Sequence, residues 1–538
     1  MSQNATFSPE IACYNVSIQK TRVMQPEYKE EHSMAQALSQ SCPPTGKNLI
    51  PDHLNTAPDY FCTWQVQLYR CNDAGPQGQR DCLTEQSIFG HEKGEGWARL
   101  HPEARQDLIF LMDDSWDVPI GALKDQSPEY GSQLLAQDKF PSFVTPGRCN
   151  ETAMRKLNDA IRSYGWRGMG GWICAQQAPR FQDADPGRYW EERLRWSENA
   201  GWLYWKIDWG TECHSYAFRR MLTEMRYRYA PHLRMEQAMI NELIPYADTF
   251  RTYDVFTLMG IPCTLEKLNV DLRYDAAPGY LGLINCMDEV YIAAALGCAI
   301  DVTRHGMVGP LPDGRPDSSF PDLHRRLKYR MDEVTRTVRW HRIAPPFAVN
   351  GRETAISGER LEDCWQVEDY TQEIEGWWKF RNGDRISRSA PARFSRGLPL
   401  PRVTPDENGD VPYVVCARYP EGAISIGTMG RARERRFWTP RCHITLDAQH
   451  ACCRSLPYDG FFGIFGEYAS LTLLTPLAQE GKRVWAQDLL GTEAVDITDA
   501  VKLGNGEVYL SGQLIHQLGT QCAHSGDLSD PGLLIRLI

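Results

Sequence analysis

The chain has 538 residues, with 58 Lys and Arg against 69 Asp and Glu and a formal net charge of −11. This balance argues against the basic surface of a nucleic-acid-binding protein and against a protein held on anionic lipid by basic segments. Hydrophobic residues make up 42% and charged residues 24% of the chain, which is ordinary globular usage and excludes wholesale disorder. We therefore expect a globular protein with no nucleic-acid and no membrane partner.

The sequence contains no run of about 18 uncharged apolar residues, so we expect no membrane span. Its first residues lack a basic region followed by an apolar run, which favours a cytoplasmic protein; a secreted or periplasmic protein whose signal peptide has been removed is the alternative. The 17 cysteines are scattered without a Cys-x-x-Cys pair. We therefore expect no metal site, no cofactor and no disulfide framework.

Residues 1–55 are polar and poorly periodic, and we interpret them as an N-terminal extension or cap. Strand-like and helix-like patterns alternate after them, with helical spacing over Met154–Tyr164 and Phe218–Tyr229 and a charged amphipathic helix over Leu323–Trp340. Eight strand candidates predict a closed parallel (β/α)8 barrel, an α/β fold, over residues 56–345. The candidates are Tyr60–Tyr69, Asp107–Met112, Gly168–Ala175, Trp202–Ile207, His232–Ala238, Thr249–Tyr253, Tyr280–Cys286 and Gly297–Val302.

The pattern changes over residues 346–538, where short strand-like runs are separated by Gly, Asn, Asp and Pro. These runs predict an antiparallel β-sandwich, and a Pro-rich break over residues 399–412 leaves open a division into two lobes. The runs are Trp377–Phe380, Tyr413–Ala417, Ala423–Ile426, His443–Leu446, Leu471–Leu474, Arg483–Ala486, Ala494–Ile497, Val508–Ser511 and Leu533–Leu537.

Polar side chains follow the barrel strands at their carboxyl ends, where the active site of such a barrel lies. A charged group in so apolar a setting requires a partner or a ligand, so these residues are the candidate site. They are Asp113 and Asp114 after the second strand, Trp172 on the third, Lys206, Asp208 and Trp209 on or after the fourth, Glu236 on the fifth, Arg251 and Asp254 around the end of the sixth, and Asp301 on the eighth.

Two carboxylates in this set differ in their expected ionisation. Lys206 and Asp208 are two residues apart and share one face of a strand, so Lys206 can hold Asp208 ionised, which suits a nucleophile. A nearby carboxylate would raise the pKa of Asp254, which suits a general acid. Two carboxyl groups with separated pKa values are what glycoside hydrolysis requires.

Three segments at these strand ends carry a family resemblance. Asp-Asp-x-Trp at Asp113–Trp116, Tyr-x-Lys-x-Asp at Tyr204–Asp208 and Arg-Thr-x-Asp at Arg251–Asp254, in this order, resemble the α-galactosidase superfamily of barrel glycosidases with a C-terminal β-sandwich. The resemblance implies that Asp208 is the nucleophile and Asp254 the acid/base.

The resemblance also implies substrate-binding roles. Asp113 and Asp114 would bind hydroxyls around C4 and C6 of the sugar, Lys206 would bind a ring hydroxyl, and Arg251 would position the substrate or Asp254. Trp172 and Glu236 are further candidates for the pocket lining.

One departure from the family pattern affects the expected sugar. Relatives usually place an aromatic residue before the nucleophile and Cys or Asn after it, whereas this chain has Ile207 and Trp209. Trp209 would reshape the floor of the pocket, which puts galactose itself in doubt.

The expected function is that of a retaining exo-acting glycoside hydrolase that cleaves a terminal α-linked galactose-like sugar from an oligosaccharide or glycoside. One alternative is the same fold acting on an α-N-acetylgalactosaminide or a β-L-arabinopyranoside. Another is a non-catalytic carbohydrate-binding barrel, in which Asp208 only pairs with Lys206 and Asp254 only caps a helix. Oligomeric state is left open, with a homo-oligomer among the alternatives.

Overall fold

The computed structural model describes residues 48–71, 75–90, 96–253, 259–303, 330–366, 383–434, 436–450 and 456–538. All of them belong to one compact unit, Pro43–Ile538. No helix among these residues is long and apolar enough to cross a membrane.

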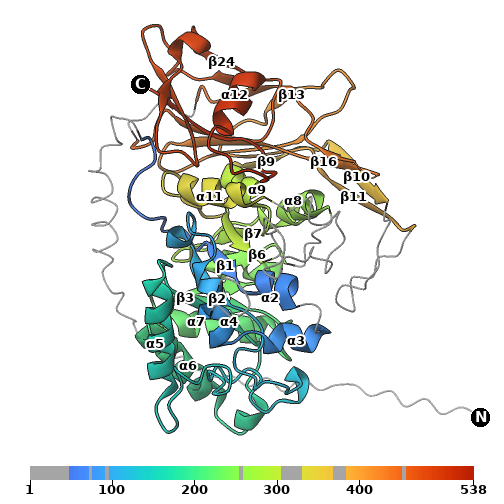
Figure 1. Ribbon diagram of the computed structural model, residues 1–538. Helices are drawn as coiled ribbons and strands as arrows, with labels where there is room; N and C mark the ends of the chain where they lie inside the picture. Colours follow the sequence, from blue (N-terminus) through green and yellow to red (C-terminus); the bar gives the residue numbers. More distant parts are fainter. Residues whose placement is uncertain are drawn as a thin grey trace, which may run out of the picture. The chain divides into compact units, whose positions relative to one another are not determined.

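Eight strands form a closed barrel in which every strand is parallel to its neighbours, and β8 closes the barrel on β1. The predicted α/β barrel is therefore confirmed (Figure 1). The strands are β1 (Tyr60–Cys62), β2 (Ile109–Met112), β3 (Met169–Ile173), β4 (Tyr204–Ile207), β5 (Arg234–Gln237), β6 (Thr249–Arg251), β7 (Leu283–Met287) and β8 (Ala299–Val302).

The sequence of each strand explains its place. β2 reads Ile-Phe-Leu-Met with all four residues buried, because helices outside and side chains inside cover both faces of a parallel strand. β4, β5 and β6 differ, since each carries at least one charged residue that is almost completely buried: Lys206, Glu236 and Arg251. Those three side chains belong to the polar cluster described in the next section.

The helices of the barrel are packed through apolar faces. In α5, for example, Ala153, Met154, Leu157 and Ile161 are buried at helical spacing. The helices are α2 (Trp64–Cys71), α3 (Gly75–Asp81), α4 (Glu85–Phe89), α5 (Asn150–Ser163), α6 (Pro186–Asn199), α7 (Tyr216–Tyr229), α8 (Gly260–Asp271), α9 (Val290–Leu296) and α11 (Met331–Trp340).

The prediction for the first strand was wrong in its second half. The predicted strand Tyr60–Tyr69 ends at Cys62, and α2 begins at Trp64. Thr63 sits at the junction, where its carbonyl accepts the first helical hydrogen bond from Gln67 N at 2.9 Å and its Oγ1 accepts one from Asp113 N at 2.8 Å. Trp64 and Val66 are both buried, and two buried residues separated by one other residue are also the pattern of a strand.

The C-terminal region contains two large sheets. An eight-stranded sheet has the order β22-β21-β25-β19-β15-β14-β12-β9, and a five-stranded sheet has the order β13-β18-β20-β24-β23. β10–β11 and β16–β17 are separate hairpins, and α12 (Gly512–Gly519) follows β24. The strands are β9 (Thr354–Ile356), β10 (Arg360–Gln366), β11 (Arg385–Pro391), β12 (Arg393–Arg396), β13 (Arg402–Thr404), β14 (Tyr413–Arg418), β15 (Ile424–Met429), β16 (Arg431–Arg433), β17 (Arg436–Trp438), β18 (His443–Asp447), β19 (Phe461–Phe465), β20 (Ser470–Leu474), β21 (Val484–Asp488), β22 (Val495–Asp496), β23 (Lys502–Gly504), β24 (Glu507–Ser511) and β25 (Gly532–Leu537).

The two large sheets pack face to face as a sandwich, but their pairing is mixed rather than wholly antiparallel. Three pairs are parallel, namely β12–β14, β15–β19 and β18–β20. The reason lies in the connections: β13 and β18 belong to the other sheet from their neighbours in sequence. When the chain leaves a sheet after one strand and passes through the opposite sheet, it can come back to the first sheet with its next strand parallel to the one it left.

The eight-stranded sheet separates two hydrophobic cores, as the alternation along β14 shows. Val414 and Cys416 belong to the core shared with the five-stranded sheet, whereas Val415 and Ala417 belong to the core shared with α9 and α11 of the barrel. The Pro-rich segment 399–412, at which a division into two lobes was left open, contains β13, which joins the five-stranded sheet. Figure 1 shows α9 and α11 against this sheet.

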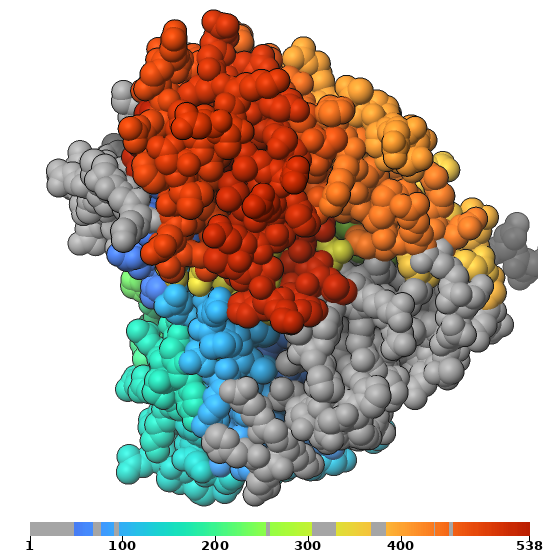
Figure 2. Space-filling model, turned by 45° about the horizontal axis from the view of Figure 1, so that its top comes forward, coloured from blue at the N-terminus to red at the C-terminus, as the bar shows by residue number. Residues whose placement is uncertain are grey.

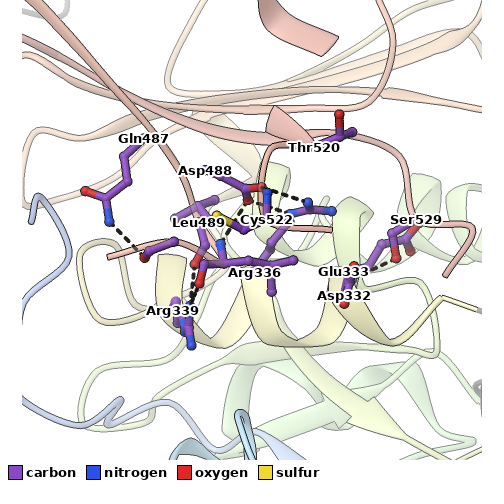
Figure 3. A network of polar contacts seen from close by, with 12 residues as sticks. Asp332, Glu333, Arg336, Arg339, Gln487, Asp488, Leu489, Thr520, Cys522 and Ser529 are labelled. Atoms are coloured by element: carbon purple, nitrogen blue, oxygen red, sulfur yellow. Dashed lines mark hydrogen bonds and ion pairs between the residues drawn. The ribbon is translucent and has the colours of Figure 1, made fainter. Parts of the chain in front are cut away.

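Polar contacts between α11 and the C-terminal sandwich reinforce this packing (Figure 3). Arg336 forms a completely buried bidentate pair with Asp488 at 3.0 and 3.2 Å. Arg339 donates to the carbonyls of Leu489 and Leu490. The first turn of α11 is capped from the sandwich side, since Ser529 Oγ accepts from Glu333 N at 3.0 Å.

Part of the expected N-terminal extension is described. Leu49 and Ile50 are buried, and Leu49 N donates to Gln487 Oε1 of β21 at 2.7 Å. Figure 2 shows the dark-blue start of the described chain beside the orange and red C-terminal sandwich. Two sequence predictions lie outside the described residues: the strand Trp377–Phe380 and the part of the helix Leu323–Trp340 that precedes Arg330.

Candidate active site

Asp208 follows β4 directly and lies at the centre of a charged cluster at the carboxyl ends of the barrel strands. Only 6% of the residue is exposed. Its Oδ2 accepts a hydrogen bond from Trp172 Nε1 at 3.1 Å and lies 3.4 Å from Arg251 Nη2. Its Oδ1 has no hydrogen-bond partner in the described part of the chain. One carboxylate oxygen is thus fixed, and no described residue hydrogen-bonds the other.

The surrounding charges keep Asp208 ionised. Burial by itself raises the pKa of Asp208, but Arg251, Lys206 and Arg219 act in the opposite direction, and the Trp172 hydrogen bond adds to their effect. The net result is a pKa below the ordinary value of an aspartate. An unprotonated carboxylate with one oxygen free of hydrogen bonds has the electronic state that a nucleophile needs.

Lys206 makes its direct contact with Asp113, not with Asp208. Lys206 Nζ lies 2.7 Å from Asp113 Oδ2, and the Cys62 thiol donates to the same oxygen at 2.7 Å. Burial acts to lower the pKa of Lys206, but the contact with Asp113 raises it above the ordinary value. The sequence-based prediction was therefore right about the charge of Lys206 near Asp208, but it did not identify Asp113 as the partner.

Asp114 is paired with a second set of cations. Its Oδ2 lies 2.8 Å from Arg80 Nε and 3.4 Å from Lys124 Nζ, and Ser115 Oγ donates to its Oδ1 at 2.9 Å. Burial acts against its charge, but Lys124 and Arg80 lower the pKa of Asp114 overall. Asp113 and Asp114 are thus two adjacent carboxylates with separate cationic partners, a suitable pair for binding sugar hydroxyls.

Arg251 joins Asp208 to a deeper carboxylate, Glu236. Arg251 Nε lies 3.2 Å from Glu236 Oε1. Glu236 is completely buried and accepts hydrogen bonds from Tyr60, Tyr204 and Asn285 at 2.9 to 3.0 Å. Glu236 therefore holds Arg251 from inside the barrel.

Arg219 on α7 contacts the backbone at the end of β4, next to the Asp208 side chain. Its guanidinium donates to the carbonyls of Ile207 and Asp208 at 3.2 and 3.1 Å and to Gln237 Oε1 at 2.9 Å. Burial lowers the pKa of Arg219 to about 10, so it stays charged at neutral pH. Sequence reasoning missed this residue because Arg219 lies in a helix and not at a strand end.

Two tryptophans border the cluster. Trp172 is buried, bonds Asp208 and is stacked on Tyr130 with ring centroids 5.9 Å apart. Trp209 is partly buried and meets Tyr253 edge to face at 6.0 Å. Both were candidates from the sequence, and the structure places both beside Asp208 or the end of β6.

The predicted acid/base residue, Asp254, lies outside the described residues. β6 ends at Arg251, and the described chain continues through Thr252 and Tyr253. The structure therefore brings together Asp113, Lys206, Asp208, Glu236 and Arg251, and the role of Asp254 stays a prediction.

Cys62 and Tyr60 are polar members of the cluster that sequence reasoning missed, and Tyr204 entered it only as part of the Tyr-x-Lys-x-Asp motif, without a role of its own. Cys62 is the last residue of β1, so the rule of strand ends would have found it if the first strand had been predicted to end there. No group of three or more His, Cys, Asp and Glu residues in the described ranges has the arrangement of a metal site.

Comparisons with protein-family models and with curated proteins found no match. Among solved structures, α-galactosidase I from Mortierella vinacea matches with a TM-score of 0.38 and 12% identity, over 90% of this chain and 98% of its own. A β-L-arabinopyranosidase from Geobacillus stearothermophilus in complex with arabinose matches with a TM-score of 0.38 and 11% identity, over 89% and 97%. An α-galactosidase from Saccharomyces cerevisiae matches with a TM-score of 0.33 and 11% identity, over 90% and 95%.

Proposed function

We propose that the chain is a retaining, exo-acting glycoside hydrolase that cleaves a terminal α-linked galactose-like sugar. The observation that carries the proposal is the state of Asp208: it is ionised by Arg251, Lys206 and Arg219 and fixed through Oδ2 by Trp172, while no described group bonds Oδ1. A structural ion pair does not need an oxygen free of hydrogen bonds, whereas a nucleophile does.

The chemistry then proceeds by double displacement. Asp208 Oδ1 attacks the anomeric carbon and forms a glycosyl-enzyme ester while the leaving oxygen takes a proton, which we assign to Asp254. Water then attacks the same carbon, Asp254 accepts its proton, and Asp208 is released as carboxylate. Two inversions at one carbon give a product with the configuration of the substrate.

Substrate binding is assigned to the charged groups around Asp208. Asp113 and Asp114 accept hydrogen bonds from hydroxyls, and Lys206 donates one, an arrangement that fits a polyhydroxylated ring. Trp172 and Trp209 offer ring faces or edges to the C–H groups of the sugar. Exo action is proposed from the resemblance of the three motif segments.

Two alternative functions are tested together with the proposed one. One alternative is the same site acting on an α-N-acetylgalactosaminide or a β-L-arabinopyranoside, because Trp209, in place of the Cys or Asn usual after the nucleophile in relatives, would reshape the pocket floor. A non-catalytic sugar-binding barrel would keep the hydroxyl-binding residues but would not need an ionised Asp208.

A panel of nitrophenyl glycosides tests the proposed function and both alternatives in one experiment. Turnover of the α-galactoside, abolished in Asp208→Asn, supports the proposal. Turnover of a different glycoside alone would identify the other sugar. Sugar binding by calorimetry without turnover of any panel member would indicate the binding protein and overturn the proposed activity.

A further inference from the structure

Below Arg251, inside the barrel, one hydroxyl group contacts two carboxyl groups. Tyr60 Oη lies 2.8 Å from Asp301 Oδ2 and 3.0 Å from Glu236 Oε1. All three residues are completely buried. Both distances are those of hydrogen bonds.

If both carboxyl groups were ionised, only one proton would be present for the two hydrogen bonds. A tyrosine hydroxyl has one proton to donate, and an ionised carboxylate can only accept. Two hydrogen bonds therefore require that one of the two carboxyl groups carries a proton and donates it to Tyr60 Oη. Two negative charges on either side of a single buried hydroxyl would also repel each other.

The partners of each carboxyl group identify the one that is protonated. Glu236 accepts hydrogen bonds from Tyr204 Oη and Asn285 Nδ2 as well as from Tyr60, and Arg251 Nε lies 3.2 Å from its Oε1 as an ion-pair partner. Asp301 Oδ1, in contrast, has no hydrogen-bond partner among the described residues. The proton therefore belongs to Asp301, and the negative charge belongs to Glu236.

Burial raises the pKa of both Glu236 and Asp301, and at Glu236 the charges of Arg251 and Lys206 and the hydrogen bonds from Tyr204 and Tyr60 act in the opposite direction. Burial raises the pKa of Asp301 to about 7, with Asp288 at the end of β7 and Glu236 on β5 adding to the effect. Arg251 on β6 and Lys206 on β4 act in the opposite direction. From β1 the facing group is Tyr60, whose own pKa is raised by burial so that its hydroxyl stays neutral.

The contacts continue from Asp301 to the proposed nucleophile. Asp301 donates to Tyr60, Tyr60 donates to Glu236, Glu236 pairs with Arg251 at 3.2 Å, and Arg251 pairs with Asp208 at 3.4 Å. If Asp301 lost its proton, a second negative charge would compete for Arg251 and weaken its hold on Asp208.

We propose that Asp301 is a positioning residue that works as a neutral carboxylic acid, directing the Tyr60 hydroxyl to Glu236 and so leaving the charge of Arg251 to Asp208. The inference rests on the proposed function for its kinetic consequence but not for its hydrogen-bond arrangement. The hydrogen-bond arrangement and its kinetic consequence are therefore tested in separate experiments.

The arrangement is tested without substrate by comparing Asp301→Asn with the wild type. A carboxyl group whose pKa is raised by folding binds its proton more tightly in the native state. Folding stability then falls as the pH rises from about 4, the unfolded value, to about 7. The amide of Asp301→Asn donates to Tyr60 at every pH, so the variant lacks this loss. We expect its melting temperature to rise relative to that of the wild type between about pH 4 and pH 7, and the difference to become constant above about pH 8.

A difference in melting temperature that is the same at every pH would overturn the proposal, and so would a difference of the opposite slope. This outcome does not depend on whether the protein hydrolyses any glycoside. A failed glycoside panel with the expected melting profile would therefore disprove the proposed function alone.

The kinetic consequence is tested with Asp301→Leu, which cannot donate, beside Asp301→Asn, which can. We expect Asp301→Leu to lose about 10-fold or more in kcat, since one misdirected charge-assisted hydrogen bond is of that order. We expect Asp301→Asn to lose much less and to extend the alkaline limb of kcat to higher pH. Equal losses in both variants, with an unchanged alkaline limb, would contradict a positioning role.

Discussion

Arg251 has the largest effect among the cations that lower the pKa of Asp208, so its removal has a predictable effect on the acid limb of the reaction. At the 3.4 Å between Arg251 Nη2 and Asp208 Oδ2, two unit charges attract each other by about 5 kcal/mol at an effective dielectric constant of about 20. Lys206 and Arg219 remain in place and compensate for part of the loss.

We therefore predict that Arg251→Met moves the acid limb of the kcat/KM profile to higher pH by about 1 unit or more, because one unit corresponds to only about 1.4 kcal/mol. The assay is the pH dependence of kcat/KM on an activated aryl glycoside, whose departure needs little help from an acid. The matched variant Arg251→Lys keeps the charge but loses the fork that reaches two carboxylates, so its limb should move less.

A control is needed because Arg251→Met also leaves Glu236 buried without its cation, which costs stability. The double variant Arg251→Met/Glu236→Gln removes that second charge and should keep the shifted limb while recovering melting temperature. If both Met variants keep the wild-type acid limb, Arg251 does not control the ionisation of Asp208, and the reasoning is refuted.

Three further predictions concern other parts of the molecule. Asp254→Ala should lower the hydrolysis rate of substrates with poor leaving groups far more than that of activated aryl glycosides, and added azide should yield a glycosyl azide. Equal rate losses for both kinds of substrate, without an azide product, would move the acid/base role to another residue. Arg336→Met should lower the free energy of unfolding in urea by about 3–5 kcal/mol because it leaves the buried Asp488 without its cation. The double variant with Asp488→Asn should recover part of that loss. An unchanged urea midpoint in the single variant would show that this pair does not hold α11 to the sandwich. Trp209→Ala should raise KM more than it lowers kcat if the indole contacts the bound sugar, whereas an unchanged KM across the glycoside panel would remove Trp209 from the pocket.

The barrel was predictable because its strands are short apolar runs buried on both faces and separated by amphipathic helices. The first strand was overextended because Trp64 and Val66 are buried in α2 at a spacing that also fits a strand. The helix is marked by backbone hydrogen bonds such as that from Gln67 N to the Thr63 carbonyl, and the side-chain pattern carries no sign of them.

The C-terminal sandwich was predicted in kind but not in pairing. Alternation along a strand such as Val414–Ala417 shows which residues face a core, but not which strand lies beside it. The parallel pairs follow from connections that cross between sheets, and these depend on contacts distant in sequence.

Within the candidate site, the rule of strand ends found Asp113, Asp208 and Arg251 because their positions are local properties of the sequence. The partners of these groups were not predictable. Lys206 is nearer in sequence to Asp208 but contacts Asp113, since the orientation of a long side chain inside the barrel depends on the neighbouring strands. Arg219 had no local signal at all.

The most direct test of the central claim, that Asp208 is a covalent nucleophile, is to trap the intermediate. A 5-fluoro-α-galactosyl fluoride, or the corresponding fluorosugar of whichever glycoside is turned over, slows release of the glycosyl-enzyme, and mass spectrometry of the intact protein and its peptides locates the label. We expect one added glycosyl unit, carried on Asp208 and absent from Asp208→Asn. A label on another carboxylate, or an unlabelled enzyme that releases a product of inverted configuration by proton NMR, would contradict the claim.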